Sequence, residues 1–473
     1  MRGFTATVAV LVVAASLVAA IPAEAVGDRV PESTGEPTGE IGAQEPPDLP
    51  EQWRQTYGAD GDDMFSDLVR TEDGGYLVVG WTQRETTEGW VVKIDGEGER
   101  EWERTLGGSG TDRFWGVAET EDGYLLAGRT DGDGGTTTAW LVELNADGEV
   151  REERTAGPGA FNAIARDGSG ADSGYLLAGW TSSGEGKALK LDENLSREWQ
   201  QTYATPDGYG SGYLRAVVPV ESENGTGGYY LAGKIEGDSN DAWALKVGSE
   251  GDREWQATAG SPNRDDAWAA APASSDADDG FVLAGETGID TDDRSGWLVK
   301  FDADGSVAWE RTPGNGALWF DSAMKTDDGY LFTGSGDGGP TGGTDGYVLR
   351  TGDDGTAEWD VYYSTQGWDK PWPAIRAHDG GYLLAGQTGG DDGGAKDGWL
   401  VRIGNGSVAG GPDSETDESG DEGSRGETAD TTDSAIRDGT ETTANDPDVE
   451  GVPGMGVGAT LLALVVLLLL ARR

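Results

Sequence analysis

The sequence predicts an all-β protein, a seven-bladed β-propeller with four strands per blade, and three observations carry this prediction. A segment like Gly-Tyr-Leu-Leu-Ala-Gly recurs seven times, roughly every fifty residues, which is a spacing typical of propellers and solenoids. Each copy is followed by a segment like Gly-Trp-Leu-Val-Lys. A third segment, like Glu-Trp-Glu-Arg-Thr, follows six of these pairs, and its seventh copy lies in front of the array at residues 51–57.

The displaced seventh copy distinguishes a closed ring from a linear solenoid. A solenoid gains nothing from the displacement, because its two ends need polar caps instead. In a ring, the strand at 51–57 would complete the last blade and hold the two ends of the array together. We therefore expect a ring-closed propeller over residues 51–404.

The four strands of each blade follow in chain order. The innermost strand is the short run before each Asp-Gly turn, such as Trp115–Thr120. The second strand is almost wholly apolar, as expected for a strand buried between blades. The third is the Trp-Leu-Val-Lys segment. The outermost alternates, with Trp102 and Arg104 on one side and Glu101 and Glu103 on the other, which predicts a half-exposed strand.

The turns and loops of the blade divide between two faces. Asp-Gly pairs such as Asp73-Gly74 favour tight turns, since glycine adopts positive φ without steric cost. Because strand direction alternates, the short turns share one face. The loops that join successive blades, and the loops between the second and third strands, share the other. This second face varies most between the repeats, so we expect it to be the functional one.

Most tryptophans and several other aromatic residues fall on repeat positions, which predicts a role in packing between blades. One copy in the outermost strand is lost, because Glu152 stands where the other blades have tryptophan. A ring of seven aromatic residues at the start of the innermost strands is expected to pack between the blades. It comprises Phe65, Phe114, Phe161, Tyr213, Trp268, Phe320 and Trp372.

Three tryptophans are less regular and lie near the loop face: Trp115, Trp319 and Trp368. We predict these as ligand-contacting residues, for instance by stacking on sugar rings, with packing as the alternative. No catalytic residue, metal ligand or cofactor is predicted. The chain has no cysteine and one histidine, His378, beside the Asp379-Gly380 turn. The pair Asp302 and Asp304 lacks the remaining ligands of a calcium loop, so turn chemistry explains it.

The formal net charge is −53 over 473 residues. Such a charge causes strong self-repulsion at ordinary ionic strength, whereas in molar salt the Debye length falls to about 3 Å. The acidic residues are thus expected to solvate the surface in a high-salt environment. Nucleic acid is excluded as a partner, because no basic stripe is present to meet phosphates.

The two ends of the chain predict secretion and anchoring. Residues 1–25 have the charge, apolar run and small-residue cleavage site, ending at Ala25, of a secretory signal. Residues 26–50 are a proline-rich acidic leader, and residues 405–451 form an acidic linker expected to be disordered. Residues 452–473 are an apolar segment that ends in two arginines and just reaches membrane-spanning length. Possible glycosylation sequons lie at Asn194, Asn224 and Asn405.

The C-terminal segment resembles the archaeal Pro-Gly-Phe sorting signal, with Pro453, Gly454 and Met455 at the motif positions and methionine in place of phenylalanine. That resemblance implies that a membrane protease removes the helix and a lipid anchor replaces it. Retention of the helix is the alternative. Either outcome would tether the propeller on the outer side of the membrane.

The run Lys300–Arg311 resembles the repeat of quinoprotein-type propellers, in which a glycine turn, here Gly305, precedes a tryptophan, here Trp309, that docks one blade on the next. In that family the repeat itself is structural. A quinone-dependent enzyme is therefore one alternative function. A hydrolase that uses a carboxylate pair on glycosides is another, although no spacing selects a pair among the 87 acidic residues.

Over residues 51–404 the chain resembles secreted archaeal and bacterial propeller proteins with repeats like Asp-Gly-Gly-Tyr-Leu-Leu-Ala-Gly. Together with the acidic composition and the sorting tail, this implies a haloarchaeal cell-surface protein. We expect a monomeric, non-enzymatic module that binds or scaffolds a protein or glycan of the cell envelope.

Overall fold

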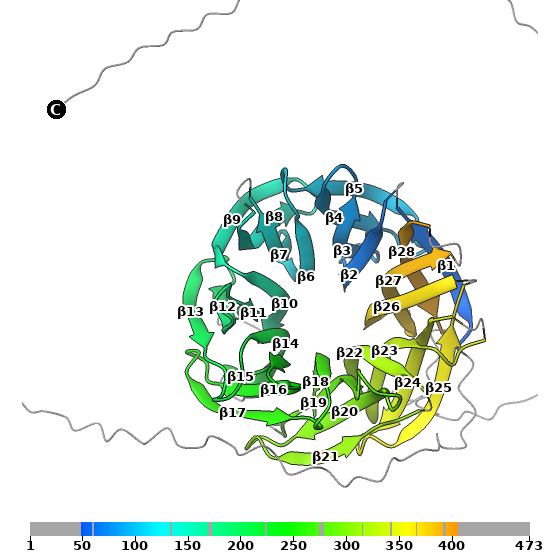
Figure 1. Cartoon of the computed structure of the whole chain (residues 1–473). Coiled ribbons are helices and arrows are strands. Elements are labelled where there is room, and N and C mark those ends of the chain that lie inside the picture. Colours follow the sequence, from blue (N-terminus) through cyan, green and yellow to red (C-terminus); the bar gives the residue numbers. More distant parts are fainter. Residues whose placement is uncertain are drawn as a thin grey trace, which may run out of the picture. The chain divides into compact units, whose positions relative to one another are not determined.

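The computed structural model describes residues 49–404, apart from 59–60, 133–134, 169–172, 223–224, 274–278, 315, 341–342, 366 and 391–393. Its 28 strands form seven four-stranded antiparallel sheets, which are arranged as blades around a central axis (Figure 1). The predicted seven-bladed β-propeller is thus confirmed.

The strands of each class occupy equivalent places in the seven sheets. The innermost strands are β2 (Asp63–Arg70), β6 (Arg113–Thr120), β10 (Ala160–Asp167), β14 (Gly212–Ser222), β18 (Asp266–Pro272), β22 (Leu318–Thr326) and β26 (Gly367–Arg376). The second strands are β3 (Tyr76–Gln83), β7 (Gly123–Asp131), β11 (Gly174–Trp180), β15 (Gly225–Glu236), β19 (Phe281–Thr287), β23 (Gly329–Gly336) and β27 (Tyr382–Gly390). The third strands are β4 (Thr87–Ile94), β8 (Thr137–Asn145), β12 (Gly186–Asp192), β16 (Asn240–Val247), β20 (Ser295–Phe301), β24 (Asp345–Gly352) and β28 (Lys396–Ile403). The outermost strands are β5 (Arg100–Leu106), β9 (Val150–Pro158), β13 (Arg197–Tyr203), β17 (Arg253–Ala259), β21 (Val307–Arg311), β25 (Ala357–Tyr363) and β1 (Glu51–Tyr57).

Strand β1 closes the ring as the displaced repeat predicts. It pairs antiparallel with β28, from Glu51 opposite Ile403 to Tyr57 opposite Gly398. Two further contacts precede the strand. The Gly404 amide donates to the Pro50 carbonyl (2.9 Å), and the Tyr363 hydroxyl donates to the Leu49 carbonyl (3.1 Å). The last blade therefore combines both ends of the described chain.

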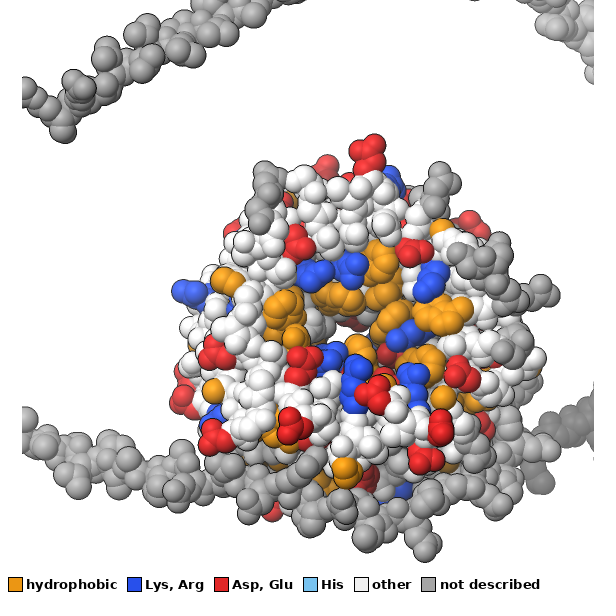
Figure 2. Space-filling view, in the orientation of Figure 1, with side chains coloured by type: hydrophobic (Ala, Val, Ile, Leu, Met, Phe, Trp, Pro, Cys, Tyr) orange, Lys and Arg blue, Asp and Glu red, His pale blue; other side chains and the backbone are white. Residues whose placement is uncertain are grey.

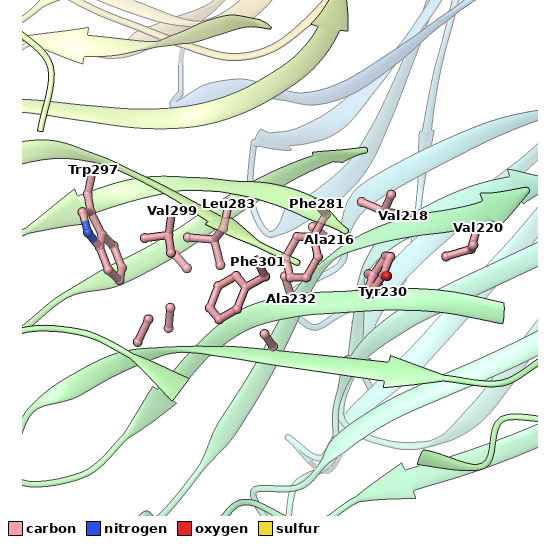
Figure 3. Packing of buried hydrophobic residues seen from close by; sticks show 14 residues of the cluster. Ala216, Val218, Val220, Tyr230, Ala232, Phe281, Leu283, Trp297, Val299 and Phe301 are labelled. Atoms are coloured by element: carbon pink, nitrogen blue, oxygen red, sulfur yellow. The ribbon is translucent and has the colours of Figure 1, made fainter. Parts of the chain in front are cut away.

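The hydrophobic core lies between adjacent blades, because the second and third strands are buried on both sides. In β19, every residue from Phe281 to Glu286 is buried, as expected for an apolar strand between two blades. One cluster joins β14–β17 to β18–β21 and includes Tyr230, Phe281 and Trp297 (Figure 3). Burial of such aromatic side chains supplies most of the contact energy between neighbouring blades.

Tryptophans of the outermost strands dock on a glycine turn of the next blade at five of the seven joints. Trp102 covers Gly148 in the turn between β8 and β9, where a Cβ would lie only 2.7 Å from the indole ring. Gly148 has φ 75°, a conformation that glycine adopts without strain. The same pairing recurs at Trp53 with Gly98, Trp199 with Gly251, Trp255 with Gly305, and Trp309 with Gly355. The predicted structural role of this glycine–tryptophan repeat agrees with this geometry.

The joint between the second and third blades lacks this pair and replaces both of its members. Glu152 stands at the tryptophan position of β9, and the facing turn carries Leu195 in place of glycine. Leu195 is the non-glycine residue with positive φ (60°) in the described part of the chain, and it is 5% exposed within the interblade cluster. The leucine side chain is thus buried at a joint that has no tryptophan in the outermost strand.

Strand β5 differs from the predicted alternation, whereas β13 retains it. In β5, Trp102 to Leu106 are all half-buried, including Glu103 on the side expected to be exposed. The reason is a hydrogen bond. The indole of Trp90 donates to the Glu103 carboxylate (2.8 Å), and Trp140 and Trp297 do the same to Glu153 (2.9 Å) and Glu310 (2.6 Å). These glutamates satisfy buried indoles and are not simply solvating groups.

Several predicted segments lie outside the described residues: the secretory signal with Ala25, most of the leader, the acidic linker, the tail with Pro453, Gly454 and Met455, and the sequons at Asn224 and Asn405. Asn194 is described and lies exposed in the turn between β12 and β13. In the residues that the structure does describe, no helix is long and apolar enough to cross a membrane.

Candidate functional site: the axial pocket

Every innermost strand carries a β-bulge at the same level. The ladder register between first and second strands shifts there in all seven blades. A bulge inserts an extra residue and redirects its side chain, and bulges are common beside functional sites. The residues at the bulges are Ser66, Trp115, Asn162, Arg215, Trp268, Asp321 and Trp372, the last followed by Pro373. The repeat thus places one side chain from each of the seven blades at equivalent positions around the axis.

These side chains line a cavity of about 530 Å³, which we call the axial pocket. It lies in the first half of the innermost strands, toward the face of the variable loops. Its aromatic lining comprises Trp115, Trp180, Tyr213, Trp268 and Trp372, and its polar lining includes Asp67, Asn162, Arg215 and Asp321. Figure 2 shows hydrophobic and basic side chains gathered around the central opening. A cavity of this size and lining is typical of small-ligand sites.

The predicted ring of seven packing aromatics is wrong in three blades. Phe65, Phe114, Phe161 and Phe320 are fully buried between blades, but the equivalent positions in the other blades are Leu214, Ala267 and Pro371. Tyr213, Trp268 and Trp372 line the pocket instead. In these three blades the aromatic residue stands next to the packing position: Tyr213 comes one residue before it, whereas Trp268 and Trp372 come one residue after it, at the bulge.

The three tryptophans predicted as ligand contacts occupy different places. Trp115 lines the pocket. Trp319 is 7% exposed and lies outside the lining, with the Arg294 guanidinium 4.4 Å from its ring centre. Trp368 also lies outside the lining, with the Lys396 ammonium 4.1 Å from its ring. Three other tryptophans line the pocket and were not predicted to do so: Trp180, Trp268 and Trp372. The bulge that presents the last two leaves no mark on the repeat spacing.

Two cations hold the wall of the pocket from the fourth to the seventh blade. Arg215 stacks 3.6 Å from the ring centre of Trp268 and donates to the carbonyl of Ala267 (3.0 Å) in the next blade. Burial lowers the pKa of Arg215 to about 10, against the opposing effect of Asp266 and Asp321. Its guanidinium remains charged at neutral pH and contributes a positive wall to the pocket.

Lys370 and Asp321 form an ion pair across the next two blades. The Lys370 ammonium lies 3.3 Å from the Asp321 carboxylate and 4.1 Å from the ring centre of Trp372. Burial raises the pKa of Asp321 to about 6, although Lys370 favours the charged form. Asp67 also lines the pocket, and burial raises its pKa to about 7. Both Asp67 oxygens accept backbone amides, from Leu68 (2.9 Å) and Val117 (2.9 Å).

We expect Asp321 to make stability fall as pH rises. A carboxyl whose folded-state pKa lies above its unfolded value binds more protons when folded, so its contribution is greatest below about pH 4 and is lost up to about pH 6. The rise of the Asp321 pKa from its usual value of 3.8 corresponds to as much as about 3 kcal/mol of the free energy of unfolding. Relative to that of Asp321→Asn, the free energy of unfolding of the wild type should therefore fall by up to that amount between pH 4 and 7. A pH-independent difference in denaturant midpoints would contradict this assignment.

Many acids near the pocket are structural. At the blade junctions, buried aspartates close the loops: Asp112 accepts the Gly108 amide (2.7 Å), and Asp265 accepts the Gly288 amide (3.0 Å). His378 lies in the turn after β26, as predicted, and its ring contacts the Gly75 carbonyl (3.0 Å). Among the described residues, no group of three potential metal-ligating side chains occurs.

Comparisons with known proteins find similarity among solved structures but assign no function to the axial pocket. No family model and no curated protein matches the chain. Similar solved structures include Sqt1 from Saccharomyces cerevisiae (11% identity, 72% of this chain and 84% of that one, TM-score 0.43). Others are Sqt1 from Chaetomium thermophilum (12% identity, 76% and 99%, TM-score 0.42) and BBS1N in complex with ARL6DN (9% identity, 76% and 99%, TM-score 0.48).

Proposed function

We propose that this chain is a non-enzymatic binding module on the outer side of the membrane of a halophilic cell, and that its axial pocket holds a glycan of the cell envelope. The single observation that carries the ligand assignment is the pocket lining. Aromatic rings alternate there with hydrogen-bonding side chains in a cavity of about 530 Å³. Sugars present apolar ring faces and polar edges, and such a lining can contact both.

A concave pocket favours a glycan over a folded protein partner. Protein partners usually need a broad interface of roughly 800 Å² per side, whereas enclosed cavities of a few hundred Å³ suit small ligands. Trp115 is the best stacking platform, because no ring or cation contacts its indole within the described structure. The secretory signal, linker and sorting tail predicted from sequence support the outer-surface location.

Replacement of Trp115 should distinguish pocket binding from general adhesion. We expect Trp115→Ala to weaken binding of envelope oligosaccharides about tenfold, since loss of a stacking ring corresponds to about 1.4 kcal/mol. Trp368→Ala serves as the matched control, because Trp368 lies outside the pocket lining. Isothermal titration of both variants in high salt measures the effect. Equal loss in both variants, or no binding by the wild type, would contradict the proposal.

Glycoside hydrolysis is the second candidate, because Asp67 and Asp321 line the pocket and their pKa values are raised to about 7 and about 6. Binding is favoured over hydrolysis, since both oxygens of Asp67 are occupied by backbone amides and Asp321 is paired with Lys370. Mass spectrometry of oligosaccharides incubated with the protein tests this alternative. Shortened products that disappear in Asp321→Asn would establish a hydrolase.

A further inference from the structure

Two arginines face each other beside the axial pocket. Arg113 on β6 lies directly opposite Arg129 on β7 in the strand ladder. Like charges at directly opposed ladder positions destabilise a sheet. Both side chains are half-buried, and the Nε atom of each is buried without a hydrogen-bond partner in the described structure. No ion pair with a described acid neutralises this pair, which we call the arginine rung.

The other blades show how the fold treats charge at the same ladder position. The fifth blade also has a like-charge rung, Asp266 opposite Glu286. There, neighbouring cations compensate both acids: Arg294 lies 2.5 Å from Glu286, and Arg264 lies 3.4 Å from Asp266. Each remaining rung carries a single cation or no charge. These rungs are Met64–Trp81, Ala160–Trp180, Tyr213–Lys234, Trp319–Ser335 and Lys370–Gln387.

Arg113 of the arginine rung is oriented by an aromatic ring. The Arg113 guanidinium lies 4.5 Å from the ring centre of Trp81, in the preceding blade. A guanidinium stacked on an indole keeps its N–H groups free at its edge, where they can bind a carboxylate or sulfate by two parallel hydrogen bonds. Burial and the nearby Arg129 lower the pKa of Arg113, with Asp131 opposing the shift. A bound anion would remove this repulsion.

The rung is adjacent to the free stacking platform. Arg113 and Trp115 stand on either side of Phe114, whose ring is fully buried between the blades. Trp115 lines the axial pocket. Strand β6 therefore carries an aromatic face and one member of the cationic pair two residues apart, and β7 supplies the other member.

We propose that the arginine rung binds the carboxylate or sulfate group of an acidic sugar whose ring stacks on Trp115. This inference rests on the proposed glycan-binding function and specifies its ligand class. On a chain with a formal charge of −53, the rung is a local exception that selects an anionic group at short range. Screening by salt reduces the long-range repulsion of such a ligand by the rest of the protein.

The test uses the double variant Arg113→Gln/Arg129→Gln and three probes: an oligogalacturonate, its neutral methyl ester and sodium sulfate. For the wild type, calorimetry should show at least tenfold tighter binding of the acid than of the ester. The double variant should lose this preference while still binding the ester. It should also melt no lower than the wild type, because a like-charge pair has been removed. Arg166→Gln/Arg376→Gln has the same charge change on half-exposed arginines of other innermost strands and should retain the preference.

The outcomes separate this inference from the proposed function. Equal binding of acid and ester by the wild type, or an undiminished preference in the double variant, would overturn the anion site but not glycan binding. Sulfate binding as tight as that of the acid would reduce the rung to an inorganic anion site and overturn the sugar assignment. Absence of binding by every probe would overturn both proposals.

Discussion

Deletion of residues up to Tyr57 should open the ring, whereas deletion up to residue 48 should leave it intact. The longer deletion removes β1, exposes the edge of β28, and takes away Trp53 and Tyr57 from the cluster between the last and first blades. We expect a loss of about 5 kcal/mol or more, which is comparable to the whole stability of many domains. Thermal melting in high salt measures the difference.

The shorter deletion is the matched control, because it retains Leu49 and Pro50 with their bonds to Tyr363 and Gly404. Equal melting temperatures for the two truncations would contradict closure by β1. A third truncation that begins at Glu51 would show how much these two residues contribute. We expect a smaller loss of about 1–2 kcal/mol, from the hydrogen bond of the Tyr363 hydroxyl to the Leu49 carbonyl and that of the Gly404 amide to the Pro50 carbonyl.

The second large effect is expected at the joint between the first two blades. Gly148→Leu should cost about 3 kcal/mol or more, from positive φ (about 1–2 kcal/mol) and from displacement of the Trp102 ring that lies 2.7 Å from the new Cβ. Trp102→Glu in the same chain should recover part of this loss. The pair would then reproduce the natural joint of Glu152 with Leu195.

A double-mutant cycle measures this coupling, since residues in direct contact are not additive. Gly74→Leu is the matched control for backbone strain alone, because Gly74 also has positive φ (90°) and nothing lies within 4 Å of its Cβ position. Leu195→Gly should also destabilise the protein, by about 2 kcal/mol. The change removes the strain of a non-glycine residue at positive φ, but the cavity left by the buried leucine costs more than this gain. Strict additivity of the Trp102 and Gly148 changes would show that the two residues do not act as one joint.

The sequence was sufficient to predict the blades, their number and their closure, because each depends on periodic features. Glycine turns and apolar second strands recur along the repeats, and the displaced strand at 51–57 breaks that recurrence. The pocket was predicted only at Trp115. Its other aromatic residues depend on the bulge, which changes the facing of Trp268 and Trp372 by one residue and is invisible to repeat spacing. The arginine rung depends on the register between β6 and β7, which places Arg129 opposite Arg113. Comparison of the repeats in the sequence does not reveal this register.

Closure by β1 also has a consequence for how the protein acquires its fold. The strand that is synthesised first pairs with the strand of the described chain that is synthesised last, so the ring cannot close until both are present. Pairing over such a separation is slow, because the chain must first lose the entropy of a long loop. Until then, β28 is an unpaired edge that could join the edge of another molecule.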